Sequence, residues 1–83
     1  MSDREAEIYR TLQSIFDDLF LAPVTLTPEL SARDVEEWDS VMHISLLLAT
    51  EQAFSIRFRV GQTEAMANVG EFVALIDRML DHA

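Results

Sequence analysis

The 83-residue sequence has no cysteine, only two glycines and only two prolines. Without cysteine the chain has no disulfide, no thiolate nucleophile and no thiolate metal ligand, so packing alone must hold the fold. Because glycine and proline mark the turns between strands, their scarcity disfavours a strand-and-turn architecture. A chain this short forms one hydrophobic core, so we expect a single domain over residues 1–83.

Lysine is also absent, and six arginines stand against 15 acidic residues, for a net charge of −9. Such an acidic chain repels nucleic acid, and its field favours partners with basic docking surfaces. No apolar run approaches the roughly 20 residues of a membrane span, and the N-terminus lacks a charged-then-apolar export signal. We therefore expect a cytoplasmic monomer with neither a nucleic-acid nor a membrane partner.

Apolar residues at three- and four-residue steps predict an all-α protein. A first amphipathic helix is expected over residues 3–20, where Ser2 and Glu5 have the spacing of a capping box. A second helix is expected over residues 40–55, a stretch without glycine or proline. It follows Asp39, which is a good N-cap residue.

The remaining segments predict a short third helix and a longer last one. Thr63 can cap a short turn through Met66, and the last helix is expected over residues 69–81. The long connection between the first two helices contains Thr27-Pro28-Glu29, which favours one helical turn. Residues 56–60 are expected to form an extended linker, since a lone strand has no partner. The predicted fold is a four-helix bundle with three longer helices and one short third helix.

Ser40, in the first turn of the second predicted helix, is the residue best placed for chemistry. The free N–H groups and the dipole of a helix start favour negative charge, so a phosphodiester on this serine would be stabilised. An aspartate and a serine before an apolar helix are equally typical of an ordinary helix start. The pair alone does not decide between these interpretations.

A hydrolase site is the enzymatic alternative, because Ser40 and His43 are three residues apart on one predicted helix, where side chains can touch, and Asp39 is adjacent to Ser40 in the sequence. A serine hydrolase also needs an oxyanion hole and a base held by a separate carboxylate, and the chain has no glycine-rich elbow. We therefore expect no enzyme activity. His43 is expected at the edge of the core, and with His82 as the other histidine it makes a poor metal site.

The four residues before the serine have simpler interpretations. Trp38 is expected to pack the loop onto the start of the helix. Glu36 and Glu37, with Asp39, could bind a cation loosely, but a solvated run of charge is the expected state.

The wider pattern resembles a known family. The signature is Trp38-Asp39-Ser40-Val41, then Leu46-Leu47-Leu48, Glu51, Phe54, Ile56 and Phe58. It is similar to the Asp-Ser-Leu motif of acyl carrier proteins with its following helix and closing aromatic residue, and the resemblance spans nearly the whole chain. It implies that a phosphopantetheinyl transferase moves 4′-phosphopantetheine from coenzyme A onto Ser40, with Asp39 as the helix cap beside the attachment site. The thiol of the arm then carries acyl groups between enzymes.

The sequence departs from the family pattern in ways that leave the cargo open. Val41 replaces the usual leucine, and polar or apolar residues replace acidic ones along the second helix, where Glu51 alone matches fatty-acid-type carriers. Aminoacyl, D-alanyl and peptidyl carriers share the fold and the serine, and an unmodified helical interaction module would use Ser40 only as a cap. The resemblance implies an acyl- or aminoacyl-loading ligase and downstream acyl-transfer enzymes as partners, in fatty acid or specialised metabolite biosynthesis.

The second helix is apolar on two sides, whose centres lie about 140° apart at 100° per residue. The resemblance assigns Leu46, Leu47 and Phe54 to the core. We therefore expect the other side to be exposed as a partner-docking stripe, formed by Val41, Ile44 and Leu48 with Met42, Ser45 and Glu51 at its margins. Since this helix has few acidic residues, docking should depend more on apolar contact than on salt-sensitive pairing.

Overall fold

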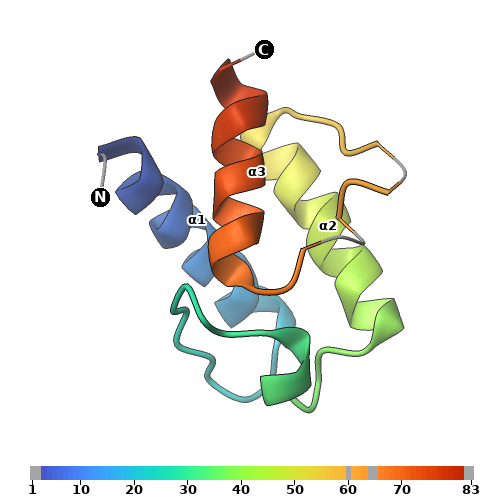
Figure 1. Ribbon diagram of the computed structural model, residues 1–83. Coiled ribbons are helices and arrows are strands. Elements are labelled where there is room, and N and C mark those ends of the chain that lie inside the picture. Colours follow the sequence, from blue (N-terminus) through green and yellow to red (C-terminus); the bar gives the residue numbers. More distant parts are fainter. Residues whose placement is uncertain (1–2, 60, 64–65, 82–83) are drawn as a thin grey trace.

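The computed structural model describes residues 3–59, 61–63 and 66–81. Its elements are, in chain order, α1 (Asp3–Leu19), the 3₁₀ helix η1 (Ala32–Asp34), α2 (Ser40–Phe54) and α3 (Val69–Asp81). The helix α1 packs against both α2 and α3, and a long connection runs beneath the bundle from α1 to α2 (Figure 1). No helix in these described ranges is long and apolar enough to cross a membrane.

The predicted all-α class and the three longer helices are confirmed, with bounds within one residue of those expected. Residues 56–59 of the predicted linker form neither helix nor strand, and Ile56 and Phe58 pack in or against the core. Ser2, the predicted cap of the first helix, lies outside the described residues.

The predicted short third helix is only partly covered by the described residues. Residues 61–63 form a turn, and the Met66 N–H group donates a hydrogen bond of 3.4 Å to the carbonyl oxygen of Thr63. Residues 64 and 65 lie outside the described part. The described ranges therefore contain three α-helices and one 3₁₀ helix, rather than the four α-helices expected.

The 3₁₀ helix η1 lies in the α1–α2 connection, close to the turn predicted at Thr27-Pro28-Glu29. That turn is closed by a hydrogen bond of 3.2 Å from the Leu30 N–H group to the Thr27 carbonyl oxygen. The unpredicted η1 follows Ser31, whose N–H and hydroxyl groups both donate to the carboxylate of Asp34. A serine followed three residues later by an acidic residue is a known start signal, so the sequence did contain a sign of η1.

The start of α3 is fastened to the same connection. The N–H groups of Val69 and Gly70, which have no partner within their own helix, donate to the carbonyl oxygens of Leu30 and Pro28 at 2.8 and 2.9 Å. A Cβ atom at Gly70 would lie 3.1 Å from the Pro28 oxygen, so glycine permits this close approach. The connection is thereby held against α3 as well as α1.

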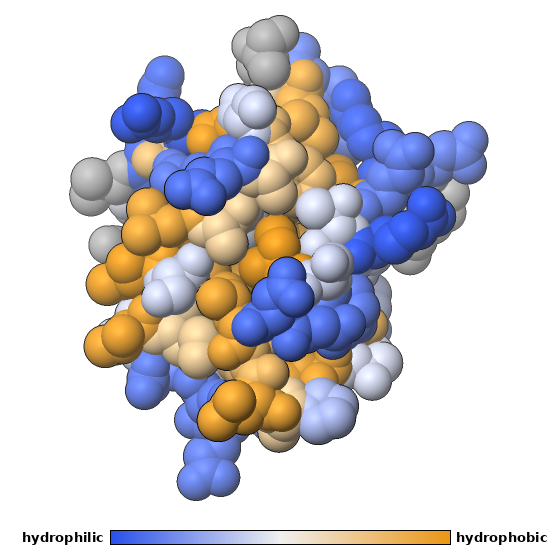
Figure 2. Space-filling view, turned by 180° about the vertical axis from the view of Figure 1, so that it is seen from behind, coloured by the Kyte–Doolittle hydropathy of each residue, from blue (hydrophilic) through white to orange (hydrophobic). Residues whose placement is uncertain are grey.

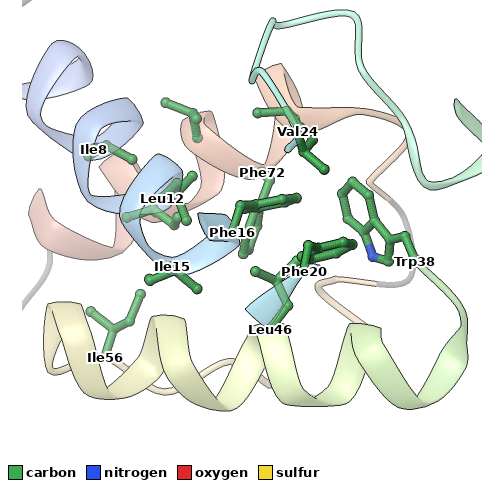
Figure 3. Packing of buried hydrophobic residues seen from close by; sticks show 13 residues of the cluster. Ile8, Leu12, Ile15, Phe16, Phe20, Val24, Trp38, Leu46, Ile56 and Phe72 are labelled. Carbon is green, nitrogen blue, oxygen red and sulfur yellow. The ribbon is translucent and has the colours of Figure 1, made fainter. Parts of the chain in front are cut away.

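All three helices and the connection contribute to one core (Figure 3). Its largest fully buried side chains include Leu12 and Phe16 of α1, Leu46 of α2, and Phe72 of α3. Phe16 stacks on Phe20 with ring centroids 4.9 Å apart. This aromatic group lies next to the end of the connection that leads into α2 (Figure 3).

The two sides of α2 differ in burial as the sequence predicts. Leu46 and Thr50 are fully buried, and the Thr50 hydroxyl donates to the Leu46 carbonyl oxygen at 2.7 Å, so its polar group is satisfied. Leu47 and Phe54, also assigned to the core, are half-buried and pack against it. The opposite side is open to solvent, with Val41, Ile44 and Leu48 exposed by 74%, 60% and 54%.

Two leucines on α2 allow a direct test of this assignment. Leu46→Ala should lower the free energy of unfolding by about 2–5 kcal/mol, because it removes a fully buried side chain and leaves a cavity. Leu48→Ala should change it by no more than about 0.5 kcal/mol, because the side chain is largely in water. Urea denaturation of both variants measures the difference. Equal losses in the two would show that the core side of α2 is assigned wrongly.

Candidate functional site

Ser40 is the first residue of α2 and is exposed to solvent. Asp39 is the N-cap, as predicted, with an extended backbone at φ −95° and ψ −173°. Its carboxylate accepts a hydrogen bond of 2.9 Å from the Met42 N–H group, and its carbonyl oxygen accepts one of 2.9 Å from the His43 N–H group. Asp39 therefore both ends the loop and fixes the first turn of α2.

The start of α2 is a favourable place for an anion. The N–H groups of Ser40 and Val41 have no acceptor within the helix, because the first turn of any helix lacks partners. Met42 is already paired with Asp39, so these two N–H groups remain beside the serine hydroxyl. Together with the positive end of the helix dipole, they would stabilise a phosphate group joined to Ser40.

Trp38 holds the loop end against the core, as predicted. It is 6% exposed and packs edge-on against Phe16 and Phe20, with ring centroids 5.3 and 6.3 Å apart. Its indole Nε1–H donates a hydrogen bond of 3.0 Å to Nδ1 of His43, which is half-buried at the edge of the core. Because Nδ1 accepts this bond, the neutral imidazole carries its proton on Nε2.

This bond to Trp38 argues against the hydrolase alternative. A catalytic histidine would need one ring nitrogen toward the serine hydroxyl and the other toward a carboxylate. Here Nδ1 of His43 faces an indole donor, and the carboxylate of Asp39 faces the N–H group of Met42. The residues that suggest a triad in the sequence are therefore used to build the start of the helix.

Glu37 corrects one expectation from the sequence. Instead of belonging to a solvated run of charge, its carboxylate accepts hydrogen bonds from the N–H groups of Leu21 and Ala22 at 3.0 and 2.8 Å. These two backbone bonds hold the pKa of Glu37 below its usual range. Glu36 is exposed. Across residues 3–59, 61–63 and 66–81, no group of acidic or histidine side chains is arranged to hold a metal ion.

Residues 37–39 thus fasten the loop before Ser40 to three different parts of the protein. Glu37 binds the chain just after α1, Trp38 enters the core, and Asp39 caps α2. Sequence reasoning anticipated the roles of Trp38 and Asp39 but missed that of Glu37. The partners of Glu37 are backbone N–H groups 15 and 16 residues away, for which residue types give no signal.

The exposed side of α2 leads away from Ser40. Figure 2 shows apolar side chains gathered along the side of the molecule formed by α2, whereas the side formed by α1 is mostly hydrophilic. Among the residues expected at the margins, Met42 and Ser45 are half-buried. The carboxylate of Glu51 accepts a hydrogen bond of 2.7 Å from the Phe58 N–H group. Glu51 therefore helps to hold the segment that follows α2.

Three helices thus pack around one core, and an exposed serine begins the second of them. The sequence matches no protein-family model and no curated protein. It does match a solved structure, the solution NMR structure of holo acyl carrier protein from Geobacter metallireducens, with 30% identity and a TM-score of 0.78. The alignment covers 98% of this chain and 90% of that one. The chain therefore belongs to the acyl carrier protein family, and it is a carrier rather than an enzyme.

The role of Glu37 can be tested through pH. A lowered pKa in the folded state adds stability above the unfolded pKa of about 4.3, and that stability is lost as pH falls through the folded value. Glu37→Gln should therefore melt at a lower temperature than the unmodified protein at pH 7, because an amide has one acceptor oxygen for two N–H donors. The difference should narrow below about pH 4.

Thermal unfolding followed by circular dichroism between pH 7 and pH 3 measures this effect. The neighbouring exposed variant Glu36→Gln is the control and should show little difference at any pH. If Glu37→Gln and Glu36→Gln behave alike at pH 7, the bonds to Leu21 and Ala22 contribute nothing to stability.

Proposed function

We propose that this protein carries an acyl group as a thioester on a 4′-phosphopantetheine arm attached to Ser40, and shuttles it between biosynthetic enzymes. The observation that supports this most directly is the exposed Ser40 hydroxyl at the first position of α2, in a member of the acyl carrier protein family. That the solved relative is a holo carrier protein adds support.

The residues around Ser40 fit such an arm. In the attachment step the serine oxygen would bond to the phosphorus of the pantetheine phosphate, and adenosine 3′,5′-bisphosphate would leave from coenzyme A. The N–H groups of Ser40 and Val41 would then face the new phosphodiester, as they would face any anion at a helix start. Asp39 directs its own negative charge toward the Met42 N–H group, which limits repulsion of the phosphate.

A rigid helix start also suits recognition by a modifying enzyme. The transferase must bring the serine oxygen in line with the phosphate of coenzyme A, and small errors in position are costly for such a step. Because residues 37–39 are fastened at three points, Ser40 is presented in one orientation.

Attachment of the arm is tested by intact-protein mass spectrometry after incubation with coenzyme A and a broad-specificity phosphopantetheinyl transferase. We expect a gain of one phosphopantetheinyl group, and none in Ser40→Ala. Ser14→Ala is the control, because this exposed serine lies on α1, away from the start of α2 and from the docking stripe. An unchanged gain in Ser40→Ala, or no gain with several transferases, would contradict attachment at Ser40.

We further propose that the docking stripe, Val41, Ile44 and Leu48, contacts the transferase, the loading ligase and the downstream acyl-transfer enzymes. Exposed branched side chains in a row beside the modified serine support this, since such patches commonly mark interaction sites. Glu51 is the one acidic residue of α2, so the helix brings little negative charge to the stripe. Contacts here should therefore be mainly apolar.

Ile44→Ser and Leu48→Ser test the docking stripe. Each should lower kcat/KM for modification by the transferase about tenfold, because each removes most of an apolar contact worth about 1.5–3 kcal/mol when buried. The loss should persist between roughly 50 and 300 mM salt, since apolar contacts are not screened. Ala53→Ser, at an exposed position on the same helix, is the control. A large drop in melting temperature would instead place these side chains in the core.

A further inference from the structure

Three of the six arginines in this acidic chain line one cleft. Arg57 and Arg59 come from the segment after α2, and Arg78 comes from the last turn of α3. Ile56 and Leu75 supply buried apolar surface to the same cleft, which has a volume of about 600 Å³. Guanidinium groups therefore surround an apolar floor.

The segment that carries two of these arginines is held by backbone geometry. Ser55 ends α2 in the left-handed conformation, with φ 56° and ψ 45°, and so redirects the chain. The N–H group of Ile56 donates to the Glu51 carbonyl oxygen at 3.1 Å, and that of Phe58 donates to the Glu51 carboxylate at 2.7 Å. In extended backbone, side chains alternate, so with Ile56 and Phe58 directed inward, Arg57 points outward.

Arg59 is fixed by a reciprocal pair of hydrogen bonds. Its N–H group donates to the Gln62 side-chain oxygen at 2.7 Å, and the Gln62 N–H group donates back to the Arg59 carbonyl oxygen at 3.1 Å. The guanidinium groups of Arg57, Arg59 and Arg78 all belong to exposed residues. The backbone at the rim of the cleft is thus held by hydrogen bonds, and it presents exposed guanidinium groups.

Within the described ranges the ion pairs join Arg4 to Asp77 and Asp81, and none involves these three arginines. The carboxylate of Glu51 lines neighbouring hollows with Arg57 and with Arg59. It keeps its charge although it accepts a hydrogen bond from Phe58, so one negative charge stands beside three positive ones. The cleft is therefore locally cationic, and beyond about 8 Å the net charge of −9 is screened at physiological ionic strength.

The cleft lies at the end of α2 away from Ser40. The helix has 15 residues and is about 22 Å long. Leu48 of the docking stripe and Arg57 of the cleft line the same shallow hollow between them. A surface that begins beside Ser40 therefore continues along α2 to the arginines.

We propose that this arginine cleft, formed by Arg57, Arg59 and Arg78, docks an acidic segment of a partner enzyme, in which carboxylates flank an apolar side chain. The proposal rests on the carrier function above, and it specifies in addition that the partner surface at this cleft is acidic. Sites for small ligands usually enclose most of the ligand. Here the arginines are exposed and the surface is continuous with the docking stripe, which suits a protein contact.

The test uses a synthetic hexapeptide of four glutamates and two leucines, added to the ¹⁵N-labelled protein and followed by NMR. Amide shifts should be confined to the segment after α2 and the last turn of α3, and should weaken with salt. The double variant Arg57→Gln/Arg78→Gln should bind at least about tenfold more weakly. Arg33→Gln, at an exposed arginine of η1 outside the cleft, should bind normally.

Two further ligands, a glutamine version of the hexapeptide and decanoate, provide outcomes that would contradict the proposal. If a hexapeptide with glutamine in place of glutamate bound as tightly as the acidic one, the cleft would not recognise carboxylates. Binding of decanoate without binding of the acidic hexapeptide would identify a small-molecule site. Testing the same samples for phosphopantetheinylation keeps the two proposals apart. If the protein accepts the arm but does not bind the peptide, only the docking inference is overturned. If it binds the peptide but does not accept the arm, only the carrier function is overturned.

Discussion

The position of Ser40 depends on how the three residues before it are fastened. Glu37 accepts two backbone hydrogen bonds from the chain after α1, Trp38 is buried against Phe16 and Phe20, and Asp39 caps α2. If any one of these contacts were lost, the long connection would have fewer constraints on where α2 begins. The loop before the serine therefore decides where its hydroxyl is exposed at the start of the helix.

Because one apolar side of α2 stays in water, the helix contributes less to the stability of the fold, and the rest of the core must offset that loss. Val41, Ile44 and Leu48 are largely exposed and so add little to the hydrophobic stabilisation of a domain whose total stability is of order 4–12 kcal/mol. The core compensates through aromatic packing of Phe16, Phe20 and Trp38. An apolar stripe kept in water by such a small domain is more readily explained by binding than by folding.

Helix positions and the two sides of α2 could be predicted because they follow from local periodicity. Ser40 could be placed at the start of a helix because Asp39 is a strong N-cap residue and the following stretch lacks glycine and proline. The hydrogen bonds of Glu37 and the pairing of Trp38 with His43 could not be predicted, because they depend on the path of the irregular connection through the fold. The arginine cleft could not be predicted either, because Arg57 and Arg78 line one cleft only when α3 lies close to the segment after α2.

The net charge, the apolar stripe and the arginines of the protein act over different distances. The approach of a partner and its final orientation can therefore depend on different parts of the surface. At low ionic strength the net charge of −9 acts over the longest distance and favours approach by basic surfaces, whatever their detailed shape. Contact with the apolar stripe requires desolvation and acts only once two surfaces touch. Between these extremes, cationic side chains at the far end of α2 would distinguish partners by local charge within about a Debye length. A partner that satisfied both ends of α2 would be held along the helix axis, with its reactive site facing Ser40, whereas a partner that matched only the apolar stripe could rotate about it.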